Sequence, residues 1–222
     1  MIKIKISKLP IYYLSGGDKT RSTHMSNTLG RLKPIPINSN KDKNRLKSIS
    51  GGFIKLMDTA FMNQEGSFKP IVILEDDVSL NRDIPKEIEI PKHTDILYIG
   101  ISRVGMNKKK WCRTVTFKNY NKDLIRISNM LTTHGFIIVS KRGFLAYYKC
   151  FMESYFKNKI SDILLAKSQP YLWVYALKNP IVYQDKIVGG KESNTKINYI
   201  DKEDVPLPID WIDNSLFMLK VR

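Results

Sequence analysis

Four consecutive aliphatic residues at positions 71–74 run directly into three carboxylates, Glu75, Asp76 and Asp77. An apolar run without polar alternation is typical of a strand that is covered on both faces, as in the parallel sheets of α/β proteins. Such sheets bind ligands at the carboxyl ends of their strands. This stretch therefore predicts a buried strand that ends in a functional site.

The three carboxylates suit a divalent metal ion. Because side chains alternate along an extended chain, we expect Glu75 and Asp77 to project to one side of the strand and Asp76 to the other. Two hard oxygen ligands suit Mg²⁺ or Mn²⁺, which complete their coordination with substrate phosphates and water. In the alternative interpretation, the three acids only solvate the junction between a strand and a loop.

Length and composition indicate one folded domain. The chain has 222 residues, of which 42% are hydrophobic, so we expect a single α/β domain over 1–222. The N-terminus is charged throughout and lacks the apolar run of a signal peptide. No other segment approaches the roughly 18 apolar residues of a membrane span, so we expect a cytoplasmic protein. Cys112 and Cys150 have no metal-type spacing, which argues against a zinc site or a disulfide framework.

The formal net charge of +16 has more than one interpretation. Clustered lysines and arginines neutralise the phosphates of nucleic acids or of anionic membranes. They can also hold an anionic small substrate, or simply form a solvated basic surface. Here the lysines are scattered, and no recognisable nucleic-acid-binding module accompanies them. We therefore do not expect nucleic acid to be the partner.

Further candidate residues precede and follow the acidic strand. Residues 10–14 predict a first strand, and the turn at 15–18 could let backbone amides approach a phosphate or a base closely. His134, before a glycine at a predicted strand start, is a metal ligand, a proton shuttle or a structural histidine. Asp162 opens a short predicted helix, where it could serve only to complement the helix dipole.

Two longer helices are also predicted. Apolar residues recur at three- and four-residue spacing across about 43–62, which is typical of an amphipathic helix. Gly51 and Gly52 lie inside it, and each costs about 1 kcal/mol relative to alanine. Either close approach of a ligand or tight packing against the sheet could explain this pair. The second helix follows Ser140, a suitable N-cap residue.

Several of these segments occur in an order that resembles a known family. The chain is similar to GT-A-type glycosyltransferases, above all the family 25 lipopolysaccharide and collagen sugar transferases, and to the short glycosyltransferase domains of large DNA viruses. The resemblance covers about residues 11–190. The matching segments are Ile11-Tyr-Tyr-Leu14 with Arg21, Ser48-Ile-Ser50-Gly-Gly-Phe53, Leu74-Glu-Asp-Asp77, Asp95-Ile-Leu-Tyr-Ile-Gly100, Thr133-His-Gly-Phe-Ile-Ile-Val-Ser140, Ser161-Asp162 and Tyr183-Gln184.

The resemblance implies both a fold and a reaction. The fold is one nucleotide-diphospho-sugar transferase domain, with a mainly parallel central sheet flanked by helices on both faces. The reaction is transfer of a sugar from a nucleoside-diphosphate sugar, most simply a UDP-sugar, to a hydroxyl of a glycan or glycoprotein acceptor. The implied cofactor is Mn²⁺ or Mg²⁺. A virus-encoded member would act in the cytoplasm of its host.

The resemblance also implies roles for individual residues. Asp77 is the direct metal ligand, and Glu75 holds the metal or the nucleotide ribose. Asp162 is the catalytic carboxylate, which acts as general base if configuration inverts and orients the acceptor if configuration is retained. The donor-binding residues are Leu14, Ser15, Gly16, Arg21, Glu75 and Asp76, and the further candidates are His134, Gln184 and Asp185.

The chain departs from the family in two ways, and other functions stay open. The small-residue helix of the family commonly carries Ser-His, where this chain has Ser50-Gly51, and the chain is shorter than typical members. The main alternative is a metal-dependent nuclease or another nucleic-acid-binding protein, because nucleases also place acidic clusters at strand ends. A nuclease should show a second acidic or His-rich motif, for which only Asp162 and Asp185 qualify. A catalytically inactive interaction module predicts no metal dependence.

Overall fold

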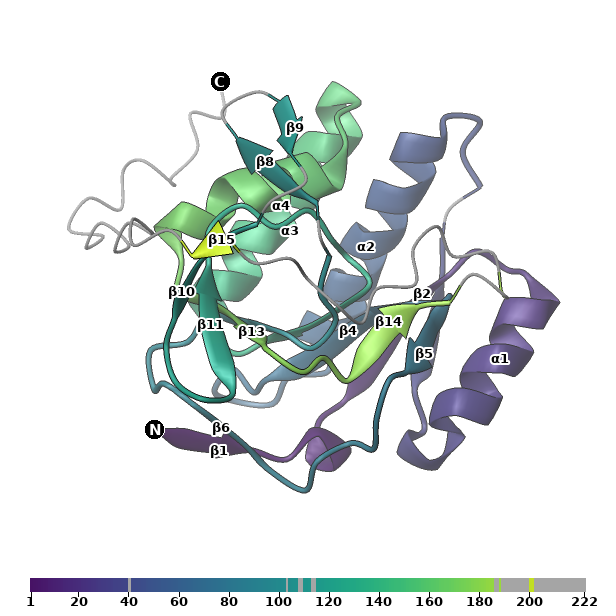
Figure 1. Cartoon of the computed structure of the whole chain (residues 1–222). Helices are drawn as coiled ribbons and strands as arrows, with labels where there is room; N and C mark the ends of the chain where they lie inside the picture. Colours follow the sequence, from purple (N-terminus) through teal and green to yellow (C-terminus); the bar gives the residue numbers. More distant parts are fainter. Residues whose placement is uncertain are drawn as a thin grey trace.

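A nine-stranded sheet forms the centre of the molecule (Figure 1). The structure, a computed structural model, describes residues 1–39, 41–102, 104–107, 110–112, 115–185, 188 and 200–201. In spatial order the strands of this sheet are β15 (Ile200–Asp201), β10 (Thr116–Asn119), β11 (Leu124–Ile127), β13 (Val174–Leu177), β7 (Ile96–Tyr98), β12 (Gly135–Ile138), β4 (Ile71–Glu75), β2 (Ile11–Ser15) and β3 (Ile35–Asn38).

The central sheet is mixed, so the expectation of a mainly parallel sheet is not confirmed. β2 pairs in parallel with both β3 and β4, whereas β12 pairs antiparallel with both β4 and β7. β11 is likewise antiparallel to both of its neighbours. One reversal has a local cause: the Asn121 side chain accepts from the backbone amides of Asp123 and Leu124 and closes the turn between β10 and β11. An apolar strand run carries no signal of strand direction.

Smaller elements surround the central sheet. Three two-stranded sheets are formed by β1 (Ile2–Ile4) with β6 (Ile88–Ile90), β5 (Val78–Leu80) with β14 (Val182–Gln184), and β8 (Gly105–Asn107) with β9 (Lys110–Cys112). The α-helices are α1 (Lys19–Leu29), α2 (Arg45–Met62), α3 (Lys141–Lys157) and α4 (Ser161–Ser168). Short 3-10 helices span Ile6–Lys8, Gly30–Leu32 and Gln169–Tyr171. None of the helices in the described ranges is long and apolar enough to cross a membrane.

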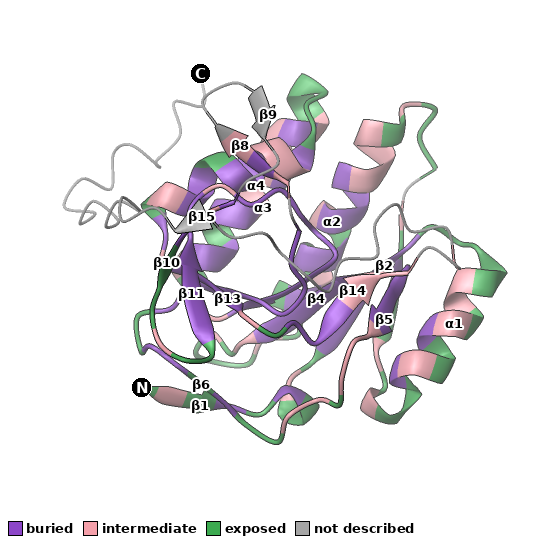
Figure 2. Ribbon diagram, viewed as in Figure 1, coloured by how far each residue is buried: buried purple, intermediate pink, exposed green. Residues whose placement is uncertain are grey.

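Helices cover both faces of the central sheet, as expected. On β2, Tyr12 and Leu14 join the apolar cluster that contains the buried residues of α2 and α3. The alternate residues Ile11 and Tyr13 join the opposite cluster, which contains the buried side chains of α1. The predicted strand at 71–74 is buried along its whole length (Figure 2). This double covering explains why its sequence shows no polar alternation.

Tight packing explains why one residue of the Gly51-Gly52 pair in α2 is a glycine. A Cβ atom on Gly52 would lie 2.5 Å from Leu14 Cδ1 of the sheet and 3.1 Å from the backbone Cα of Ser39. Real Cβ atoms do not approach so closely, so the tight-packing alternative accounts for Gly52. α2 also packs antiparallel on α3, with the rings of Phe53 and Phe151 stacked 4.5 Å apart.

Candidate functional site

Three parallel strands and the start of an antiparallel one meet at the edge that carries the acidic motif. β2, β3 and β4 all end there, with Leu14 paired to Glu75 and Ser15 paired to Asn38. β12 begins at the same edge, because Gly135 pairs with Leu74. The loops that follow β2, β3 and β4 and the loop that precedes β12 therefore converge on the carboxylates.

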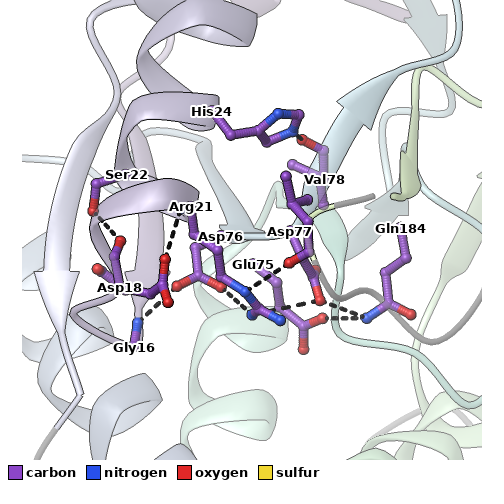
Figure 3. A network of polar contacts seen from close by, with 12 residues as sticks. Gly16, Asp18, Arg21, Ser22, His24, Glu75, Asp76, Asp77, Val78 and Gln184 are labelled. Atoms are coloured by element: carbon purple, nitrogen blue, oxygen red, sulfur yellow. Dashed lines mark hydrogen bonds and ion pairs between the residues drawn. The ribbon is translucent and has the colours of Figure 1, made fainter. Parts of the chain in front are cut away.

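Asp76 is held by the loop after β2 and by α1. The backbone amide of Gly16 donates to Asp76 Oδ2 at 2.7 Å, and Arg21 Nη1 donates to Asp76 Oδ1 at 2.7 Å. Asp18 caps α1 by accepting from the backbone amide of Arg21, which fixes Arg21 in the first helical turn beside the acids (Figure 3). The Arg21 guanidinium also lies 3.6 Å from Asp77 Oδ2, and its Nε donates to the carbonyl oxygen of Val188.

Glu75 and Asp77 converge on a different partner. The side-chain amide of Gln184 donates to Glu75 Oε2 at 3.0 Å and contacts Asp77 Oδ2 at 3.5 Å. Gln184 reaches them because β14 pairs with β5, with Gln184 opposite Val78. The backbone amide of Asp185 also donates to the carbonyl oxygen of Asp77. The Gln184 amide thus contacts both Glu75 and Asp77, whereas Arg21 contacts both Asp76 and Asp77 (Figure 3).

The carboxylate cluster is electrostatically strained. Burial, together with the nearby charges of Asp77 and Asp162, raises the pKa of Glu75 to about 8. Burial also raises the pKa of Asp77 and that of Asp162. The hydroxyl of Thr133 links the two sides of this cluster, because it contacts Glu75 Oε1 and lies 3.3 Å from Asp162 Oδ1. Desolvation and mutual repulsion therefore favour either protonation or an additional cation.

The residues present fit a divalent ion that also takes substrate oxygens. Asp77 Oδ1 is buried and makes no hydrogen bond within the described part of the chain. Its other oxygen and Glu75 share one amide, so the two carboxylates lie near enough to serve one ion. The described residues contain no group of three or more histidine, cysteine, aspartate or glutamate side chains placed to hold a metal. Mg²⁺ bound with substrate phosphates usually takes one or two protein carboxylates, a number that the pair Glu75 and Asp77 could supply.

A cavity of about 590 Å³ opens onto these side chains. Most of the residues that the sequence singled out line it: Leu14, Gly16, Arg21, Glu75, Asp76, Asp77, Asp162 and Gln184. Sequence reasoning gave no role to the remaining lining residues, which are Ser39, Arg45, Leu46, Ser48, Ile49, Thr133, Ile160 and Ser161. Arg45 is the first helical residue of α2 and adds a second arginine to the wall. Only Thr133 carried a usable signal, since it stands immediately before the His134-Gly135 strand start.

Three of the candidate residues do not line this cavity. Ser15 is buried, and its hydroxyl accepts from the backbone amide of Gly17. The His134 ring packs under Gly100, and burial lowers its pKa to about 4. The Asp185 carboxylate accepts from the Ser79 hydroxyl at 2.7 Å. The roles proposed for these three residues stay predictions.

His24, which carried no prediction, supports the loop after the acids. Its Nε2 lies 2.9 Å from the carbonyl oxygen of Val78 and 3.0 Å from the Ser79 hydroxyl. α1 is thereby joined to β5 directly behind Asp77. No sequence pattern marks this contact, because His24 and Ser79 are 55 positions apart.

Comparison with known proteins adds little to this geometry. No family model and no curated protein sequence matches the chain. Among solved structures, the nucleoside-diphosphate-sugar pyrophosphorylase from Vibrio cholerae RC9 is 10% identical over 77% of this chain and 73% of its own, with a TM-score of 0.41. The CTP:phosphocholine cytidylyltransferase from Streptococcus pneumoniae is 10% identical over 79% of this chain and 72% of its own, also with a TM-score of 0.41. At these values neither likeness carries an argument about this chain.

Proposed function

We propose that this protein is a divalent-metal-dependent glycosyltransferase that uses a nucleoside-diphosphate sugar, most simply a UDP-sugar. The observation that carries the proposal is the convergence of Glu75 and Asp77 in the same cavity as Asp162. A carboxylate pair suits an ion that also binds a diphosphate, and a separate buried carboxylate suits the hydroxyl of an acceptor. The order of motifs along the chain, which resembles that of GT-A enzymes, supports the same assignment.

On this proposal, Asp77 and Glu75 hold Mn²⁺ or Mg²⁺. Such an ion, when bound, neutralises the negative charge that develops on the diphosphate as the sugar departs. Arg21 contributes a fixed positive charge next to the ion site, and arginine suits fork-like binding of phosphate oxygens. Asp76 keeps Arg21 in place through the 2.7 Å ion pair, and the backbone of the loop at Gly16 closes the donor side of the cavity.

Asp162 is the proposed catalytic carboxylate. Burial raises its pKa, and a carboxylate with a raised pKa accepts a proton from a hydroxyl more readily than an exposed one does. In an inverting enzyme Asp162 removes that proton from the acceptor as the new glycosidic bond forms. In a retaining enzyme it accepts a hydrogen bond from the same hydroxyl and orients it. The acceptor on either scheme is a hydroxyl of a glycan or glycoprotein.

The nuclease alternative has less support. It requires a second acidic group at the site, and Asp185 turns its carboxylate to Ser79 instead of lining the cavity. Asp162 alone does not complete a group of metal-binding side chains among the residues that the structure describes. The lysines are scattered along the sequence, and no recognisable nucleic-acid-binding module accompanies them.

The proposed reaction is tested by incubating the purified protein with UDP-glucose, UDP-galactose, UDP-N-acetylglucosamine and GDP-mannose. Release of nucleoside diphosphate is measured with Mn²⁺, with Mg²⁺ and with EDTA, and Asp77→Asn is the control. We expect metal-dependent release from at least one donor, and loss of this release in the variant. Metal-dependent cleavage of plasmid DNA without release from any donor would instead favour the nuclease.

A further inference from the structure

A second hollow runs along the surface between α2 and α3. This α2–α3 groove has a volume of about 370 Å³. Its residues are Gly51, Ile54, Lys55 and Asp58 of α2, and Tyr148, Met152, Tyr155 and Phe156 of α3. None of these residues has a role in the site described above.

One end of the α2–α3 groove lies toward the cavity, because neighbouring positions of α2, and of the chain at and after the end of α3, line the two hollows. Along α2, Ser48 lines the cavity, and Gly51 and Lys55 follow on the same helical stripe in the groove. On the opposite wall, Phe156 lines the groove at the end of α3, and the chain turns at Asn158 so that Ile160 and Asp162 line the cavity. A ligand that extends from Asp162 along the surface therefore enters this groove.

The lining of the groove combines exposed aromatic rings with polar groups. Phe156 is 70% exposed, and its ring meets that of Tyr155 edge-on at 5.4 Å. Asp58 of α2 and Tyr148 of α3 also line the groove, where burial and the nearby Asp58 carboxylate raise the pKa of the Tyr148 hydroxyl. A large exposed aromatic side chain at the edge of a hollow is a typical binding feature, because it offers apolar area at little entropic cost.

This combination matches the chemistry of sugar rings. A pyranose presents a face of C–H bonds, which packs on an aromatic ring, and a rim of hydroxyls, which need polar partners such as Asp58 and Lys55. An acyl chain has no use for these polar groups. We propose that the α2–α3 groove binds the sugar rings of an oligosaccharide acceptor whose terminal hydroxyl reaches Asp162. The acceptor role rests on the proposed function, whereas saccharide binding itself does not.

The test measures binding of cellotriose, maltotriose and chitotriose without any donor. Saturation-transfer NMR identifies which trisaccharide binds, and calorimetry gives its affinity for wild type, Phe156→Ala, Phe156→Trp and Leu145→Ala. Leu145 is the matched control, because it is an apolar side chain of the same helix, is 55% exposed and lies outside the groove. We expect Phe156→Ala to weaken binding roughly tenfold. Phe156→Trp and Leu145→Ala should bind as wild type does, and urea denaturation checks that all variants fold.

Three outcomes would overturn the groove assignment. The first is that no trisaccharide binds, and the second is that Phe156→Ala binds as tightly as wild type. The third is that Phe156→Ala abolishes self-association in analytical ultracentrifugation, or binding to phosphatidylcholine vesicles, without affecting any saccharide. Binding of UDP with Mn²⁺ is measured on the same samples. If UDP binds with Mn²⁺ but no saccharide binds, the groove assignment fails and the proposed function stands. If a saccharide binds in the groove but UDP does not bind with Mn²⁺, the proposed function fails and the groove assignment stands.

Discussion

The raised pKa of Glu75 makes a quantitative prediction about stability. In the folded protein Glu75 holds its proton up to a pKa of about 8, whereas in the unfolded chain it ionises near 4.5. Between these values the folded state binds one proton more than the unfolded state, so stability falls as pH rises. The slope is about 1.4 kcal/mol per pH unit, which gives a ceiling of about 4 kcal/mol between pH 5 and pH 8. Glu75 is partly exposed, and its titration is coupled to that of Asp77 and Asp162. We therefore expect the free energy of unfolding to fall by about 2–3 kcal/mol between pH 5 and pH 8.

The test compares wild type with Glu75→Gln in EDTA. The glutamine keeps an acceptor for Thr133 but has no charge to lose, so the extra loss of stability at high pH should disappear. Urea denaturation at pH 5, 6.5 and 8 gives the free energy of unfolding of both proteins, and contributions from groups outside this carboxylate cluster cancel in the difference. Adding Mn²⁺ should stabilise wild type more at pH 8 than at pH 5, because the ion competes with the proton. Parallel pH dependences in the two proteins would refute the account of this cluster.

Three further substitutions have defined outcomes. Asp77→Asn should remove the metal-dependent part of donor binding, measured by calorimetry, while the circular dichroism spectrum is unchanged; unaltered metal-dependent heat would contradict the ligand role. Asp162→Asn should lower the transfer rate by about 100-fold or more and leave the donor affinity within a factor of two, roughly 0.4 kcal/mol; a selective loss of donor affinity would count against an acceptor-side role. Gly52→Ala should destabilise the protein by about 1–3 kcal/mol in thermal or urea unfolding, because its Cβ meets Leu14 and the backbone of Ser39. The control Gly30→Ala, with no atom within 4 Å of its Cβ, should change little, and equal effects of the two would show that packing is not the cause.

The part of the site that lies on neighbouring sequence could be predicted. An uninterrupted apolar run can only be a doubly covered strand here, so the run predicted both β4 and the position of Glu75 at its end. Arg21 was assigned to the donor site only through the family resemblance, which places an arginine downstream of the first strand. The inference about β4 works because strand burial leaves a local pattern.

The remaining features depend on contacts between distant positions. Gln184 reaches Glu75 only through the pairing of β14 with β5, across 109 positions, and nothing near Gln184 in the sequence announces that pairing. No local sequence pattern indicates the direction of a strand either, so the sequence did not predict that the sheet is mixed. Asp185 and His134 were candidates by residue type, but neither is among the residues that line the cavity. The sequence also does not show that Phe156 is exposed beside the groove, because this depends on how α2 and α3 pack against each other.

The extent of a single domain over 1–222 and the cytoplasmic location stay predictions. So does the identity of the metal, since the carboxylate pair suits Mn²⁺ and Mg²⁺ equally. The reaction class likewise rests on the proposed function, and the donor and saccharide panels are designed to identify the sugar and the acceptor.

Calorimetric titration of UDP-glucose and UDP into the wild-type protein, with Mn²⁺ or with EDTA, tests the central claim most directly. The account predicts saturable binding of a nucleoside diphosphate with Mn²⁺, reduced at least tenfold by EDTA, or about 1.4 kcal/mol. If neither nucleotide gives metal-dependent heat, and GDP and GDP-mannose give none either, then Glu75 and Asp77 do not form a metal-assisted diphosphate site.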